Sequence, residues 1–137
     1  MKNALQFIAA FLFVFAAFFA YVYMSTKEVR VMSSVFMHHI GANEMDQAYA
    51  MLDKKLQAKV PLTAFTHQFA DNKLNTLKSV DWTSYSFKDS IETAEGFITL
   101  QSGVQGAIRI RVAKLNSDPA YSIISYWFNG VINEDQL

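Results

Sequence analysis

The sequence predicts an α+β fold, with an N-terminal transmembrane helix followed by short helices packed on a curved antiparallel sheet of about four strands, cone-shaped overall. Two observations lead to this prediction. The chain opens with a long uncharged apolar run. Further on, the hydrophobic spacing changes from the three-to-four period of helices to the two-residue period of strands.

The opening run, Ala4 to Met24, contains no charged residue. As a helix at about 1.5 Å per residue it measures about 31 Å, close to the roughly 30 Å hydrocarbon core of a bilayer. Tyr21 and Tyr23 suit the aromatic belt at a membrane interface. We therefore predict an uncleaved membrane anchor.

Two alternatives remain for this run. A cleaved signal peptide has a shorter apolar stretch, and Phe18 stands where a small residue is preferred before the cleavage site. A buried core helix needs a domain large enough to cover an all-apolar helix on every side, and the rest of this chain is small.

The flanking charges bear on orientation. Lys2 lies on one side of the run, and Lys27 and Arg30 lie on the other, so the positive-inside rule is nearly balanced. A very short basic N-terminus before an apolar run is typical of a signal anchor that exports the C-terminal part. We predict a single-pass protein of the bacterial inner membrane with its domain in the periplasm, and the lack of cysteine is compatible with that compartment.

The helical part of the sequence continues beyond the anchor. Apolar residues from Val29 to Ile40 follow helical spacing, and Gly41 is a suitable end for that helix. Asn43 is expected to cap a second helix that reaches Pro61, where a third begins. The chain thus divides into an anchor, a membrane-proximal helix, a folded domain and a tail, at residues 1–26, 27–42, 43–130 and 131–137.

Four later segments alternate between apolar and polar residues and are predicted to be strands: Val80–Phe87, Ala94–Leu100, Ala107–Leu115 and Tyr121–Phe128. In the third, Arg109 and Arg111 share one face and apolar residues occupy the other. Turn residues at Ser102-Gly103 and at Asn116–Pro119 flank that strand, so neighbouring strands are expected to be antiparallel.

A family resemblance rests on three of these segments. They read Glu95-Gly96-Phe97-Ile98-Thr99-Leu100, Gly106-Ala107-Ile108-Arg109-Ile110-Arg111-Val112 and Ala120-Tyr121-Ser122-Ile123-Ile124-Ser125-Tyr126. Behind a membrane segment and short helices, this pattern resembles the small bacterial nuclear-transport-factor-like (cystatin-like) domains, over about Asn43 to Phe128. Many of these carry a Trp-Lys-Ile core in the last strand, where this chain has Tyr121-Ser122-Ile123. A more distant likeness is to membrane-anchored assembly subunits of bacterial secretion machines.

The resemblance implies the cone-shaped fold but not an activity, because this fold hosts enzymes, ligand binders and assembly factors. Steroid-isomerase-like members use a buried carboxylate base with hydroxyl or acid donors. Asp81 and Tyr49 are the nearest candidates for these groups, without a matching motif around them. His38 and His39 are adjacent and would point about 100° apart on a helix, unlike an i, i+4 metal pair. We therefore predict no enzymatic activity, no cofactor and no metal.

The last predicted strand is apolar on both faces. Tyr121, Ile123, Ser125 and Trp127 fall on one face, and Ser122, Ile124, Tyr126 and Phe128 fall on the other. Either the strand is covered on both sides, or an exposed aromatic patch binds a partner. The candidate partner-binding residues are Tyr121, Ile123, Tyr126, Trp127 and Phe128, with Arg109 and Arg111 as a polar rim.

Two functions remain in competition. We favour a non-enzymatic, membrane-anchored accessory or scaffolding subunit that contacts the lipid bilayer and other membrane or periplasmic proteins. The alternative is a tethered domain that holds a small apolar ligand in the cone, lined by Tyr49, Phe65 and Phe69. The 12 basic and 12 acidic residues balance, so the net charge does not favour nucleic acid as a partner.

Overall fold

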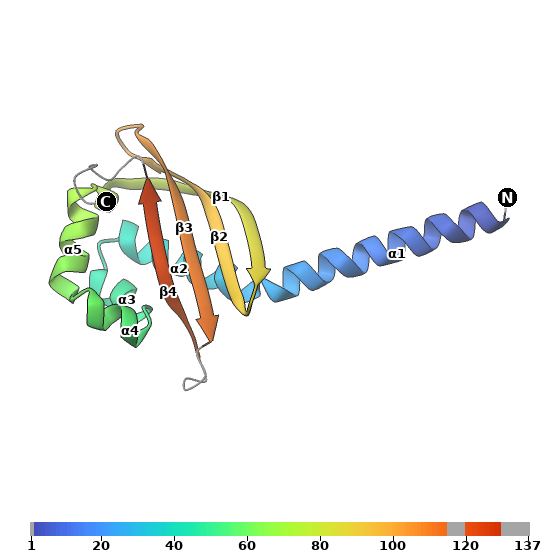
Figure 1. The fold of residues 1–137 in the computed structure, drawn as a ribbon. Helices are drawn as coiled ribbons and strands as arrows, with labels where there is room; N and C mark the ends of the chain where they lie inside the picture. Colours follow the sequence, from blue (N-terminus) through green and yellow to red (C-terminus); the bar gives the residue numbers. More distant parts are fainter. Residues whose placement is uncertain (1, 115–119, 130–137) are drawn as a thin grey trace.

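The structure is a computed structural model and describes residues 2–114 and 120–129. The predicted α+β fold class is confirmed: helices come first, and a four-stranded antiparallel sheet of order β1-β2-β3-β4 follows. The helices lie on one side of the curved sheet, behind it in Figure 1. The elements are α1 (Lys2–Ser25), α2 (Lys27–Gly41), α3 (Met45–Ala50), α4 (Lys54–Lys59), α5 (Leu62–Asp71), the 3-10 helix η1 (Leu74–Thr76), β1 (Leu77–Lys88), β2 (Ile91–Leu100), β3 (Gln105–Lys114) and β4 (Tyr121–Asn129).

Helix α1 is the predicted apolar helix, and it extends away from the rest of the chain (Figure 1). None of its described residues is buried against the domain. Among the helices in residues 2–114 and 120–129, it is the one whose length and composition suffice to cross a membrane. An apolar helix that the described part of the chain leaves unburied needs a lipid environment or another protein around it.

Helix α2 is the central helix of the domain. It packs against β1, β2 and β3, and Val29, Phe36, Met37 and Ile40 on its sheet side are buried. It ends at Gly41, as predicted. The segment expected to be a separate membrane-proximal helix is thus part of the hydrophobic core.

One predicted helix is interrupted. The segment expected to run without a break to Pro61 forms α3 and α4, because the chain between them pairs with β4. The N–H of Ile123 donates to the carbonyl of Met51, and the N–H of Asp53 donates to the carbonyl of Ile123, each at 2.9 Å. The carboxylate of Asp53 then caps α4 by accepting from the N–H of Lys55 at 3.0 Å.

The predicted cap at Asn43 is also wrong. Asn43 has a positive φ of 60°, and the cap position of α3 is Glu44, which makes no side-chain cap bond. Instead, the carboxylate of Glu44 lies 2.5 Å from Nδ1 of His39 and joins the start of α3 to the end of α2. The pair of His39 and Glu44, and not a cap at Asn43, therefore connects the two helices across the turn.

Two hairpin turns connect the first three strands. Asp89 and Ser90 join β1 to β2, and both have positive φ, at 53° and 64°, as in a two-residue type I′ turn. The turn predicted at Ser102-Gly103 lies between β2 and β3, with Gly103 at a φ of 88°. Leu115, the turn predicted at 116–119 and the tail at 131–137 lie outside the described residues.

Candidate functional site: the outer face of the sheet

A bulge in β4 decides which aromatic residues face outward. Arg111 pairs with Ser125 and Val112 pairs with Ile123, so Ile124 is an extra residue in β4. The predicted strict alternation of this strand is therefore wrong. Ile123 lies on the inner face together with Tyr126 and Phe128, whereas Ser125 and Trp127 lie on the outer face.

The three inner residues of β4 belong to the core and not to an exposed patch. Ile123 and Phe128 are buried, and the ring of Tyr126 lies 5.5 Å from that of Phe69, measured between centroids. The Tyr126 hydroxyl donates to Oε1 of Gln68 at 2.7 Å. Burial, with a smaller contribution from Tyr49, raises the pKa of Tyr126 to about 12, so this hydroxyl stays protonated and acts as a donor.

The structure brings the three predicted pocket residues together in an aromatic cluster. Phe65 and Phe69 are buried with ring centroids 4.6 Å apart, and Tyr49 lies 5.4 Å from Phe65. The Tyr49 hydroxyl donates to two backbone carbonyls, at 3.0 Å and 2.8 Å. Phe65 and Phe69 also contact Phe36, and ring contacts of this kind are how core aromatics pack.

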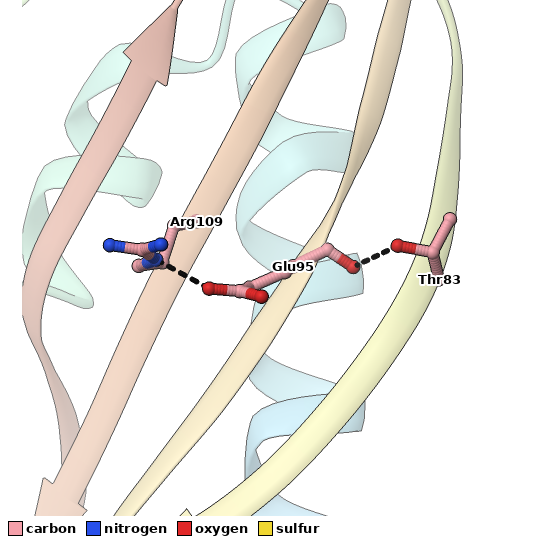
Figure 2. Close-up of polar contacts among 3 residues, drawn as sticks. All are labelled: Thr83, Glu95 and Arg109. Carbon is pink, nitrogen blue, oxygen red and sulfur yellow. Dashed lines mark hydrogen bonds and ion pairs between the residues drawn. The ribbon is translucent and has the colours of Figure 1, made fainter.

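A row of side chains crosses the outer face of all four strands. Nε of Arg109 on β3 lies 2.6 Å from Oε1 of Glu95 on β2, and the Arg109 guanidinium carbon lies 5.6 Å from the centre of the Trp127 ring on β4. On the other side, the hydroxyl of Thr83 on β1 donates to the Glu95 carbonyl at 3.3 Å, and Figure 2 shows this chain of contacts from Thr83 to Arg109. We call these residues the outer row.

The outer row orients side chains more than it stabilises the fold. Glu95 and Arg109 are both substantially exposed, and an exposed ion pair contributes only about 0–1 kcal/mol. An exposed cation–π contact such as that of Arg109 with Trp127 adds about 0.5–1 kcal/mol. Together they hold one guanidinium between a carboxylate and an indole in a fixed position on the surface.

Phe97 extends this face. It follows Glu95 by two residues on β2, pairs with Ala107 and is 52% exposed, and Trp127 is 40% exposed. Of the predicted rim residues, Arg109 is in the outer row, and Arg111 lies on the same face, opposite Thr93 and Ser125. We call Phe97, Trp127, Glu95, Arg109 and Arg111 together the aromatic outer surface.

The other exposed candidate lies apart from this surface. Tyr121 opens β4 opposite Lys114, at the far end of the strand from Trp127, and is 39% exposed. The sequence reasoning missed Phe97 and Glu95. The pairing of Glu95 with Arg109 could have been predicted from the turn at Ser102. Each of the two residues is seven positions from Ser102, so they lie opposite each other in the hairpin.

The residues considered as candidates for catalysis or metal binding do not lie together in the structure. Asp81 pairs with the exposed Phe97 and therefore shares the outer face, whereas Tyr49 is in the inner cluster. His39 is paired with Glu44, and His67 lies on α5. Within the part of the chain that the structure describes, no group of three or more histidine, cysteine, aspartate or glutamate side chains is placed to hold a metal ion.

No protein-family model matches this chain, and comparison with curated proteins gives no match.

Proposed function

We propose that the protein is a non-enzymatic accessory or scaffolding subunit of a bacterial inner-membrane complex. In this proposal α1 anchors the chain, and the α+β domain lies in the periplasm and binds a partner protein through the aromatic outer surface. The observation that carries the proposal is the pair of exposed aromatics, Phe97 and Trp127, beside a fixed arginine on a sheet face that no described helix covers.

The composition of this surface suits protein recognition. Tryptophan, other aromatics and arginine are enriched where binding energy concentrates in protein interfaces. Arg109 is already held by Glu95 and Trp127, so a partner that contacts it loses less side-chain entropy on binding. The fitting partner presents a flat apolar surface edged by groups that accept hydrogen bonds from arginine.

One further observation supports this reading over the tethered ligand-binding domain. The residues that would line a ligand cavity, Tyr49, Phe65 and Phe69, pack against each other. The resemblance to nuclear-transport-factor-like domains is compatible with both functions, and the short basic N-terminus favours export of the domain in either case.

The test compares the assembly state of matched variants. Tagged full-length protein is crosslinked in its native membrane, solubilised in mild detergent and sized, and the same is done for Trp127→Ala and Phe97→Ala. The control is Leu62→Ala, which removes an exposed apolar side chain (37%) from α5, away from the outer face.

We expect the parent and the Leu62→Ala protein to migrate in a larger assembly. The Trp127→Ala and Phe97→Ala proteins should keep their melting temperature within a few degrees and bind the partner about tenfold more weakly, equivalent to about 1.4 kcal/mol. A parent protein that migrates as a lone monomer or dimer would contradict the proposal. An equal loss of partner binding in all three variants would show that the interface is not on the aromatic outer surface.

A further inference from the structure

The helix that leaves the apolar segment enters the domain without a linker. Thr26, between α1 and α2, is buried; its N–H donates to the carbonyl of Val22 at 3.1 Å, and its own carbonyl accepts from the N–H of Arg30 at 3.2 Å. The Thr26 hydroxyl also donates to the Val22 carbonyl at 2.8 Å and accepts from Nε of Arg30 at 3.1 Å. These bonds bridge the junction, although the dihedral angles of Thr26 (φ −114°, ψ 14°) are not helical and separate α1 from α2.

The start of β2 is fastened to the same junction. Glu92 is buried on the inner face, and its Oε1 accepts from the N–H of Val29 in the first turn of α2, at 3.4 Å. A carboxylate at this position satisfies a backbone donor that has no partner within the helix. The β1–β2 hairpin therefore has a fixed place beside the end of α1.

An arginine joins the hairpin to α1 itself. The guanidinium carbon of Arg30 lies 3.9 Å from the ring centre of Tyr85 on β1 and 5.0 Å from that of Tyr23 in α1. Helix α1 and β1 are in direct contact, and β1 is the edge strand on the side from which α1 departs (Figure 1). Tyr85 and Tyr23 are thus brought to either side of one cation.

Beyond Tyr85, the strand ends in an exposed aromatic and a lysine. Phe87 shares the face of Tyr85, pairs with Glu92 and is 45% exposed, and Lys88 is the last residue before the turn. Tyr21 and Tyr23 on α1 are exposed as well. Aromatic rings together with a lysine whose stem covers apolar surface are typical of the layer between lipid tails and water.

We infer that the β1–β2 hairpin is a second membrane contact of this protein. Phe87 lies in the interfacial layer of the bilayer that α1 crosses, at the level of Tyr21 and Tyr23, and Lys88 reaches the headgroups. The inference rests on the membrane anchor of the proposed function. The occupant is lipid because the hairpin is fixed against the last turns of the apolar helix, where the chain leaves the bilayer.

The chain has no cysteine, so single nitroxide labels can be placed without other changes. Full-length Lys88→Cys, Tyr23→Cys and Ser102→Cys proteins are labelled and reconstituted in vesicles of phosphatidylethanolamine and phosphatidylglycerol. Electron paramagnetic resonance then compares the accessibility of each label to oxygen, which concentrates in lipid, and to a water-soluble nickel chelate. Ser102 is the control, since it lies in the hairpin turn at the opposite end of β2.

We expect the labels at positions 88 and 23 to favour oxygen and the label at position 102 to favour the nickel chelate. A label at 88 that behaves like the one at 102, with 23 in lipid, would overturn the hairpin contact and leave the anchor intact. A label at 23 that is also in water would remove the anchor on which both proposals rest. Lipid contact at all three positions would show general adsorption of the domain and overturn the specific contact.

A second pair of variants tests the aromatic side chain. In the Lys88→Cys protein, Phe87→Ser should abolish the lipid signal, because the ring that enters the interface is gone. The matched change Phe97→Ser removes a similarly exposed phenylalanine from the outer face and should leave the signal unchanged. Equal responses to the two changes, whether loss or retention, would overturn the role assigned to Phe87.

Discussion

Replacing Gly96 with alanine is expected to destabilise the domain, although alanine is ordinarily the better residue within a strand. Gly96 pairs with Trp82, next to the register shift at which Thr83 is the extra residue of β1. A Cβ added to Gly96 would lie 2.3 Å from the carbonyl oxygen of Asp81 and 2.9 Å from Cα of Trp82. Both neighbours are backbone atoms, so no side chain can turn aside to make room.

Two opposing contributions set the magnitude. Alanine costs less backbone entropy than glycine and would stabilise a strand by about 0.5–1 kcal/mol. The added methyl, however, comes about 0.7 Å closer to the Asp81 oxygen than the 3.0 Å that real Cβ atoms respect. Moving β1 away from β2 costs about 1–3 kcal/mol, as in other overpacked sites. The net expectation is a loss of about 1–2 kcal/mol.

Substitutions at two other glycines serve as controls, because the direction of their effect on the free energy of unfolding can be stated in advance. A Cβ at Gly41 would make only an ordinary contact, 3.5 Å from Leu77, so Gly41→Ala should stabilise α2 by up to about 1 kcal/mol. At Gly103 there is open space around a Cβ but φ is +88°, so Gly103→Ala should cost about 1–2 kcal/mol through backbone strain alone.

The assay is guanidinium unfolding of the full-length protein in mild detergent, followed by near-ultraviolet circular dichroism, since Trp82 lies opposite Gly96. A Gly96→Ala protein as stable as the parent, or more stable, would show that the β1–β2 spacing relaxes without cost. The same variant should also weaken partner binding, because Gly96 stands between Glu95 and Phe97.

Three further predictions use the same unfolding assay. Burial raises the pKa of Glu92, only partly offset by the N–H groups of Val29 and Glu28, so the folded protein holds this proton more tightly than the unfolded chain. Stability should therefore be highest below the ordinary carboxyl pKa and fall as pH rises through the raised one; unfolding at several pH values should show a smaller fall in Glu92→Gln. Phe36→Ala should cost about 3–5 kcal/mol because Phe36 is buried and its ring lies against those of Phe65, Phe69 and Tyr126, and Phe36→Leu should cost clearly less. Ser90→Gly should stabilise the protein by about 1 kcal/mol by relieving a φ of 64° in the type I′ turn, seen as a higher denaturation midpoint.

The sequence was sufficient for the fold class because the period of the hydrophobic pattern is a local signal. The change of period predicted four strands within a few residues of the observed ones, and Gly41 was correctly placed as the end of α2. The break between α3 and α4 was not visible, since it depends on Ile123, about 70 residues further along, which pairs with Met51 and Asp53. Only the folded arrangement supplies that partner.

Only part of the candidate site could be predicted, because the bulge in β4 also depends on how the strand pairs in the folded sheet. Trp127, Arg109 and Arg111 were placed on a surface, and they share the outer face. Ile123 was assigned to the face of Trp127, but a single extra residue, Ile124, reverses the facing of the strand before it and places Ile123 on the inner face with Tyr126 and Phe128. A bulge of this kind leaves no mark in the composition of the strand, which explains why both faces looked apolar.

The one-residue junction at Thr26 has a consequence for how the domain is oriented. Thr26 is buried and is hydrogen-bonded to Val22 on one side and to Arg30 on the other, so α1 meets α2 without a flexible linker. Adding one residue within α1 would turn the part of the helix before it by about 100° around its axis, relative to the domain, while lengthening it by only about 1.5 Å. The number of residues in α1 therefore decides which side of this apolar helix faces in the same direction as Trp127, and a change of length there would reorient the domain without altering any of its own contacts.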